Sequence, residues 1–201
     1  TVGQEGRDLK ETFFNREELE NGNIKYGMKS KELYEIFANY DVIATSSIFT
    51  LQTRMHFEIA KIAKKVAADK GKKILVISGG VNARALREHF LSNGFDIIAL
   101  GEGERTIVQI IDQFSSNKPD YSKVERIAFR ENDRTIITSA QPRKGTKFID
   151  HLPSPSIESM PLQTYADLGI PHWGLPVAGK KFSSIQTARG CQDKCTFCHI
   201  S

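Results

Sequence analysis

Short apolar runs alternate with longer helical patterns in the first part of the chain. Residues 41–46 (DVIATS), 73–77 (KILVI) and 96–100 (DIIAL) are nearly continuous apolar runs that end in small or turn residues. Such runs are typical of parallel strands that are buried on both faces of an α/β sheet. The pattern therefore predicts three parallel strands.

Helical patterns separate these strands. In residues 53–71, apolar side chains recur at helical spacing until Gly71, and a glycine is common just past a helix end. Residues 83–94 and 105–116 predict two more helices, and we expect Ser30 to cap a helix that leads into the first strand. This order predicts a doubly wound parallel sheet of the Rossmann or flavodoxin type, here without its first strand or two.

The pattern changes after residue 117. Residues 124–130 and 134–140 flank a polar turn and predict a β-hairpin. Six of the seven prolines lie in residues 142–176, and proline cannot continue a helix or a central strand. We therefore expect an extended interdomain linker there, followed by one more strand at residues 182–188 (FSSIQTA).

Composition excludes several classes of protein. The chain has 201 residues, of which 39% are hydrophobic and 26% charged, so it is neither disordered nor collagen-like. No apolar run approaches the roughly 18 residues of a membrane span, and the N-terminus has no signal-peptide layout. A net charge of +4 is too small to indicate nucleic acid, and the lysines of residues 61–73 fit a solvated helix face.

All three cysteines, Cys191, Cys195 and Cys198, lie in the last eleven positions. An odd number in one loop argues against a disulfide framework and favours a reduced compartment, which we take to be the cytoplasm. The spacing C-x3-C-x2-C lets three thiolates bind three irons of a [4Fe–4S] cluster. With no fourth cysteine, the remaining iron keeps an open position for another ligand. These cysteines are the candidate metal ligands and catalytic residues.

Loops rich in small residues follow the three predicted strands. Ligands of open parallel sheets bind beyond the carboxyl ends of the strands, and small residues let a backbone approach a large, flat ligand. Acidic residues in the third loop would repel a pyrophosphate, although they also suit an ordinary helix N-terminus. We expect leucine at Gly80 or Gly103 to exclude this ligand and leave the fold intact. The candidate contacts are Ser46, Ser47, Thr50, Gln52, Gly79, Gly80, Val81, Asn82, Gly101, Glu102, Gly103 and Glu104.

The segment RGCQDKCTFC (189–198) resembles the cluster motif of radical S-adenosylmethionine (SAM) enzymes. The resemblance implies that SAM binds the open iron and is cleaved to a 5′-deoxyadenosyl radical. It also implies that residues 182–188 form the first strand of a (β/α) barrel, the motif lying on the loop that follows. Phe197 takes the position where the family usually has an aromatic side chain near the adenine.

The preceding region resembles the cobalamin-binding domain that is fused to many radical SAM proteins. SSIFTLQ, SGGVNA and FDIIALGEGERTI carry this resemblance, and the hairpin, the proline-rich stretch and the cysteines follow in the order expected of that branch. It implies a cobalamin-binding α/β domain at 1–117, a hairpin and linker at 118–180, and the start of a radical SAM barrel at 181–201. We expect the chain to be a fragment cut at both ends. The lower-ligand motif D-x-H-x-x-G is absent from it.

The function that this resemblance implies is methyl transfer by a cobalamin-dependent radical SAM enzyme. SAM would methylate the cobalt and also supply the radical that takes a hydrogen atom from a small-molecule or peptide substrate. An external electron donor would be a partner, whereas nucleic acid and a membrane span are not expected. The fragment alone is expected to be inactive, because the rest of the barrel holds SAM and substrate.

Other interpretations remain open. The runner-up is another cobalamin-binding radical SAM reaction, such as ring closure. A non-catalytic cobalamin carrier fits residues 30–116 but leaves the cysteines unexplained. Residues 195–199 also spell C-x-x-C-H, the attachment motif for c-type haem, and His199 could complete a zinc site with the three cysteines. Methylthiotransferases share the cysteine spacing but need further cysteines upstream.

Overall fold

The computed structural model describes most of the α/β region and separate parts of the remainder. Contacts divide the chain into two compact units, Met28–Asp150 and a second made of Thr1–Gly27 with His151–Ser201. Each unit is described by itself. The described residues are 15–18, 22, 24–139, 152–154, 156–167, 181, 183, 189, 193 and 195–198.

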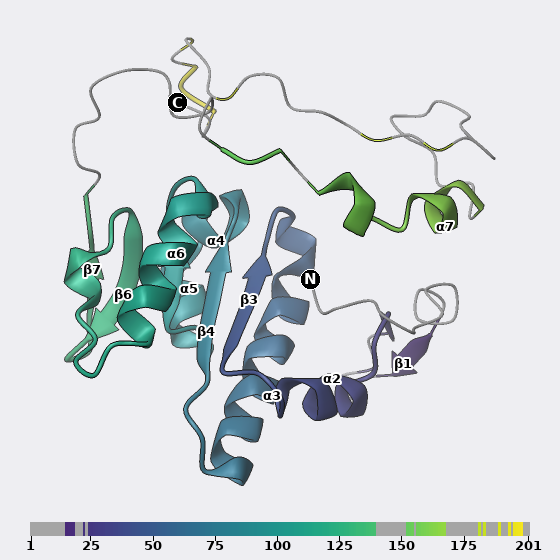
Figure 1. Cartoon of the computed structure of the whole chain (residues 1–201), viewed down its shortest axis with the longest axis horizontal. Helices are drawn as coiled ribbons and strands as arrows, with labels where there is room; N and C mark the ends of the chain where they lie inside the picture. Colours follow the sequence, from purple (N-terminus) through teal and green to yellow (C-terminus); the bar gives the residue numbers. More distant parts are fainter. Residues whose placement is uncertain are drawn as a thin grey trace. The chain divides into compact units, whose positions relative to one another are not determined.

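The unit Met28–Asp150 is built on a five-stranded sheet in the order β3-β4-β5-β6-β7 (Figure 1). The first three strands run parallel and the last two antiparallel. The strands are β3 (Val42–Ser46), β4 (Leu75–Gly79), β5 (Ile97–Ala99), β6 (Ile127–Glu131) and β7 (Arg134–Ile137). The three predicted parallel strands are therefore confirmed, with ends shifted by one or two residues.

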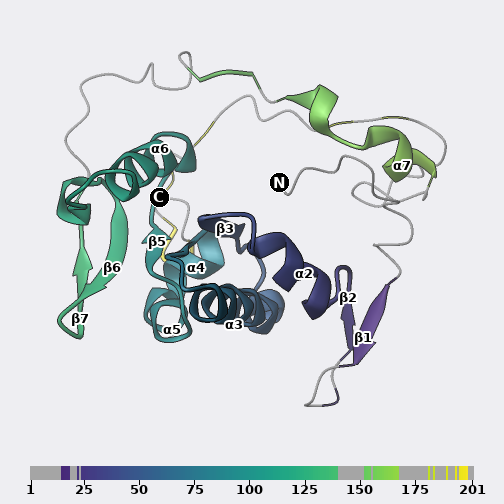
Figure 2. The ribbon, with the colours of Figure 1, turned by 60° about the horizontal axis from the view of Figure 1, so that its bottom comes forward.

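Helices cover both faces of this sheet. Figure 2 shows α3 (Thr53–Lys70) and α5 (Arg87–Ser92) on one face and α6 (Gly103–Phe114) on the other. Alternate strand residues point to opposite faces, so each face has its own apolar layer. One continuous buried cluster joins β4, β5, β6 and α6, and consists of Leu75, Ile77, Ile97, Ile110, Val124, Ile127 and Phe129. On the α3 and α5 face, Phe90 packs against Phe57 and Phe95, with ring centroids 5.2 and 5.1 Å apart.

The helix over residues 53–71 is confirmed, and Gly71 ends it in the left-handed conformation with φ 60°. The expected cap at Ser30 is wrong by one residue. Ser30 is the first residue of α2 (Ser30–Phe37), and Lys29 is the N-cap. The Glu32 carboxylate accepts a hydrogen bond of 2.8 Å from the Lys29 backbone N–H, which is the bond from the N-cap to the third helical residue in a capping box.

The expected single helix over 83–94 is two helices, α4 (Val81–Ala85) and α5, which meet at Leu86. Leu86 has φ −102° and ψ 28°, outside the helical region. The break lets α4 begin directly after the glycines that follow β4, while α5 turns to bury Phe90 and Leu91. The third predicted helix corresponds to α6, which begins two residues earlier than expected.

The predicted hairpin is confirmed, but it does not stand apart from the sheet. β6 pairs with β5, with Ile97 opposite Phe129, so the sheet is mixed rather than wholly parallel. The expected all-parallel sheet is therefore wrong on this side, because the apolar face of β6 completes the core beneath α6. Asn132 and Asp133 form the two-residue turn with φ 48° and 61°.

The other unit contains short elements. β1 (Arg16–Glu18) pairs antiparallel with β2 (Ile24–Tyr26), a hairpin that the sequence pattern did not predict. The 3-10 turn η4 (Ile157–Ser159) and helix α7 (Leu162–Asp167) lie within the expected linker. That stretch is thus not wholly extended. Pro161 is compatible with α7 because it lies just before the first helical residue, and a residue at that position donates no N–H bond within the helix.

The predicted strand at residues 182–188 lies outside the described residues except for Ser183, and the barrel that it would begin stays a prediction. Among the residues that the structure describes, no helix has the length and apolar character needed to cross a membrane.

Candidate functional site

The carboxyl ends of β3, β4 and β5 form one edge of the sheet. Ser46 stands opposite Gly79 in the parallel register, so the loops after β3 and β4 leave the sheet at the same level. The Ser47 N–H donates a 2.8 Å hydrogen bond to the Gly79 carbonyl, and the Asn82 N–H donates one of 3.1 Å to the Ser47 carbonyl. The expected meeting of these loops at one edge is therefore observed.

The Asn82 side chain fastens the loop after β4 to the loop after β3. Its amide nitrogen Nδ2 donates to Ser47 Oγ at 2.8 Å and to Thr53 Oγ1 at 2.9 Å. Asn82 is 5% exposed and Ser47 is fully buried. Both were predicted ligand contacts, and their side chains face each other beneath the loops. In this structure they position the loops, which is a task the sequence pattern did not assign to them.

Gly80 is confined by the same loop contact. It has φ +91°, and an added Cβ would collide with the Ser47 carbonyl oxygen and lie 3.0 Å from the carbonyl carbon. The expectation that leucine at Gly80 would leave the fold intact is therefore wrong. A side chain here would separate the two loops before it reached any ligand.

Gly103 and Gly101 differ from Gly80 and from each other. Gly103 is the first residue of α6, and an added Cβ would have no heavy atom within 4 Å. At Gly101 the Cβ would lie 2.7 Å from Cδ of Arg126, a side chain that is brought there by the antiparallel strand β6. Sequence reasoning missed Arg126 because it placed the hairpin in the linker. The residue lies beside Gly101 at this edge of the sheet, and its guanidinium supplies a positive charge there.

An apolar rim borders the same edge. Ile48, Phe49, Leu51 and Val81 lie in the loops after β3 and β4, and they are exposed by 55%, 62%, 98% and 50%. Thr50 and Gln52, two predicted contacts, lie beside them in the 3-10 turn η1 (Thr50–Gln52) and are also exposed. Large apolar side chains gathered at the border of a site point to a ligand or partner surface. Of these four, only Val81 was among the predicted contacts.

The acidic residues of the third loop lie at the N-terminus of α6. Glu102 is the N-cap of α6 and Glu104 lies in its first turn, and both side chains are exposed. The Thr106 hydroxyl donates a 3.1 Å hydrogen bond to the Glu102 carbonyl. This placement agrees with ordinary stabilising charge at a helix N-terminus, and a contact of either carboxylate with a ligand stays a prediction.

The cysteine segment is described at its last four positions. The Cys198 N–H donates a 3.1 Å hydrogen bond to the Cys195 carbonyl, which closes a turn over Thr196 and Phe197. Neither Cys195 nor Cys198 is in a disulfide, and the Phe197 side chain is 87% exposed. Cys191 lies outside the described residues, so the expected three-thiolate set stays a prediction. Within the described ranges, no three His, Cys, Asp or Glu side chains form a metal-binding group.

The described residues fit the groups that the sequence predicts. A broad ligand could rest on the strand edge, where Gly103 is open to added atoms and apolar side chains form the rim. The two described thiols are held on one turn and are not consumed in a disulfide, as metal ligands require.

No family model matches this chain. Curated proteins do match it. The cytidylyl-2-hydroxyethylphosphonate methyltransferase of Streptomyces wedmorensis is 25% identical over 212 residues, which cover 94% of this chain and 39% of that protein. The cobalamin-dependent radical SAM methyltransferase TokK of Streptomyces tokunonensis is 24% identical over 174 residues, covering 84% of this chain and 23% of TokK.

Among solved structures, the cobalamin-dependent SAM radical enzyme OxsB, with aqua-cobalamin and SAM bound, is 20% identical with a TM-score of 0.47. That alignment covers 56% of this chain and 15% of OxsB. The chain thus spans less than two fifths of the length of either curated relative above.

Proposed function

We propose that this chain, a relative of the cobalamin-dependent radical SAM methyltransferases, is the cobalamin-binding and cluster-binding part of such an enzyme. The observation that carries the proposal is the match to TokK over 84% of the chain, which agrees with the cysteine spacing and the strand edge. When bound, the cluster supplies the electron that cleaves SAM, and cobalamin supplies the methyl group.

The residues of this chain would bind and position these groups. Cys191, Cys195 and Cys198 would hold the cluster and leave one iron for SAM, with Phe197 against the adenine. The loops after β3, β4 and β5 would hold cobalamin, with the exposed apolar rim excluding water from its flat face. The substrate would be a small molecule or a peptide, and reduction would come from an external electron donor. Three cysteines confined to one loop suit a reducing cytoplasm.

Iron loading tests the cluster. A chain extended to include the predicted barrel, reconstituted anaerobically with iron and sulfide, is expected to bind about four irons per chain. Alanine at Cys191, Cys195 or Cys198 should abolish this loading, whereas Phe197→Ala should retain it. A full cluster in Cys191→Ala, covalently attached haem, or one bound zinc would contradict the proposal.

Cobalamin binding tests the strand edge. Equilibrium dialysis with aqua-cobalamin should show binding by the unaltered chain and at least tenfold weaker binding by Gly103→Leu, because Gly103 has open space that a side chain would fill. Ser116→Leu is the matched control, because it makes the same substitution to leucine at an exposed position just beyond the other end of α6. It should bind aqua-cobalamin as tightly as the unaltered chain. Equal affinity of all three proteins would contradict a cobalamin site at this edge.

A further inference from the structure

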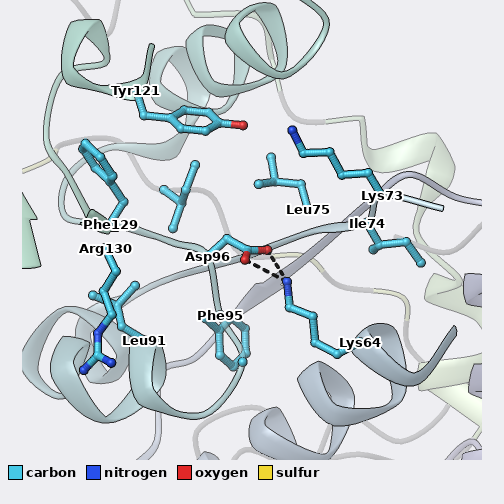
Figure 3. Close-up of a pocket in the computed structure, with 12 residues that line it drawn as sticks. Lys64, Lys73, Ile74, Leu75, Leu91, Phe95, Asp96, Tyr121, Phe129 and Arg130 are labelled. Atoms are coloured by element: carbon cyan, nitrogen blue, oxygen red, sulfur yellow. Dashed lines mark hydrogen bonds and ion pairs between the residues drawn. The ribbon is translucent and has the colours of Figure 1, made fainter. Parts of the chain in front are cut away.

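A cavity of about 460 Å³ lies at the opposite edge of the same sheet (Figure 3). It is formed by the amino ends of β4 and β5 together with the end of β6, which reaches this edge because it runs antiparallel. Small-molecule sites commonly have volumes of roughly 300–1,000 Å³. All of its lining residues belong to the unit Met28–Asp150. The proposed function gives this cavity no role.

Two of the charged residues in the cavity wall neutralise each other. Lys64 Nζ lies 2.7 and 2.6 Å from the two carboxylate oxygens of Asp96, and one of these oxygens also accepts a 2.8 Å hydrogen bond from the Val76 N–H. A third charged group, the Arg130 guanidinium, donates to Ser92 Oγ at 2.9 Å. Asp96 is therefore engaged in holding α3 to the sheet.

Lys73 and Arg130 are cations of the cavity wall that form no ion pair within the described part of the chain, and in Figure 3 the Arg130 guanidinium points away from Tyr121. Lys73 is the cation that faces Tyr121. Its ammonium lies 5.2 Å from the centroid of the Phe114 ring. In Figure 3 the Lys73 ammonium and the Tyr121 hydroxyl point toward one another. Both groups are hydrogen-bond donors on the wall of the cavity.

Tyr121 offers a donor at the same place. Its hydroxyl oxygen is buried and has no hydrogen-bond partner among the described residues, although buried polar groups are normally paired. Its ring packs against Phe129, with centroids 6.1 Å apart. Burial, and then the nearby Asp96 carboxylate, raise the pKa of Tyr121 above its ordinary value, so the hydroxyl keeps its proton at neutral pH.

We propose that this cavity binds a small organic monocarboxylate. The carboxylate would accept hydrogen bonds from the Tyr121 hydroxyl and the Lys73 ammonium, and the apolar body would pack on Leu75 and Phe129. The Lys73 ammonium is the cation that faces Tyr121, and at that place it matches one negative charge. Inorganic phosphate has no apolar body to pack on Leu75 and Phe129 and would bind less well.

The test uses the full 201-residue chain and three probes, namely hexanoate, its uncharged analogue hexanol, and inorganic phosphate. Titration calorimetry should show hexanoate binding at least tenfold more tightly than either of the others. Amide chemical shifts of Val76 and Asp96 should move with hexanoate, which locates binding at this edge.

Variants distinguish binding inside the cavity from a general effect of positive charge on the protein surface. Lys73→Met should weaken hexanoate binding at least tenfold, and Tyr121→Phe, which keeps the ring, at least threefold. Lys70→Met removes the same charge from the exposed end of α3 outside the cavity and should bind as the unaltered chain does. Absence of hexanoate binding, equal binding of hexanol, tighter binding of phosphate, or equal losses in Lys70→Met and Lys73→Met would overturn the proposal.

Discussion

Two glycines at one edge of the sheet respond to substitution in opposite ways. Gly80→Ala forces a residue with φ +91° to carry a Cβ against the Ser47 carbonyl, and we expect a loss of about 2 kcal/mol or more in the free energy of unfolding. Gly103→Ala places a methyl group in open space at the start of α6 and should raise that free energy by roughly 0.4–1 kcal/mol. Urea unfolding followed by circular dichroism measures both, and equal changes would contradict this account.

The buried imidazole of His56 gives the stability of the unit a dependence on pH. His56 is 8% exposed, its Nδ1 has no hydrogen-bond partner in the described structure, and burial lowers its pKa below the ordinary value. The unfolded chain therefore binds more protons below about pH 6.5, and stability falls as pH decreases from there toward the folded pKa.

His56→Leu should remove this dependence. The unaltered chain is expected to lose up to about 1.4 kcal/mol per pH unit in that window, whereas the variant loses less. His89, which is exposed, provides the control: His89→Leu should keep the slope of the unaltered chain. Parallel pH profiles for all three proteins would show that His56 does not titrate on unfolding.

For single residues, the sequence predicted that the loops after β3 and β4 meet at one edge, but it did not predict the contact that each residue makes. Small residues after apolar strands predict a ligand edge, because strand polarity alone brings such loops together. The burial of Ser47 and Asn82 against each other could not be predicted, since it depends on the exact paths of two loops. Arg126 was missed because the pairing of β6 with β5 brings it to this edge. Tyr121 was missed because its place depends on packing against Phe129 of β6.

Among the elements, the turn between β6 and β7 offers a direct test of hairpin geometry. Asn132 and Asp133 both have positive φ, as two-residue hairpin turns require, and both side chains are exposed. Asp133→Gly should stabilise the unit by roughly 0.5 kcal/mol, because glycine adopts this conformation without strain. Asp133→Val should destabilise it by about 1–2 kcal/mol. Thermal unfolding checks the order, and a valine variant as stable as the glycine variant would contradict it.

Elements with a strong internal period were the easiest to predict. The 18-residue helix α3 and the buried strands β3 and β4 follow from apolar spacing that any window of the sequence displays. The break at Leu86 was not visible, because residues 81–92 keep one helical pattern across it. The short helix α7 was not predicted because it lies in a proline-rich stretch. Proline is excluded from a helix interior but is permitted at a helix start.

For the whole molecule, the division into two compact units predicts independent stability. The buried cluster beneath α6 and every strand of the five-stranded sheet belong to Met28–Asp150. A chain of residues 28–150 should therefore unfold cooperatively, with a urea midpoint close to that of the α/β transition in the 201-residue chain. A midpoint lower by more than about a quarter would show that the other unit contributes to this core.

How much of the function could be predicted for the whole molecule depends on the share of its relatives' length that the chain covers. The match reaches 94% of this chain but 39% of the phosphonate methyltransferase. Cysteine spacing is a local signal, so cluster binding could be predicted from eight residues. Substrate contacts come from many segments that only a complete fold brings together, and no local pattern in this chain encodes them.

The hydrogen bonds from Asn82 to the loop after β3 also bear on the speed of recognition. Two loops that are already joined to each other lose little motional freedom when a ligand arrives, so the entropic cost of ordering them is small. Association at a preformed surface needs no slow rearrangement, and substitutions on its rim change mainly the lifetime of the complex. Replacing Leu51 or Phe49 should therefore speed the departure of a bound ligand far more than it slows its arrival.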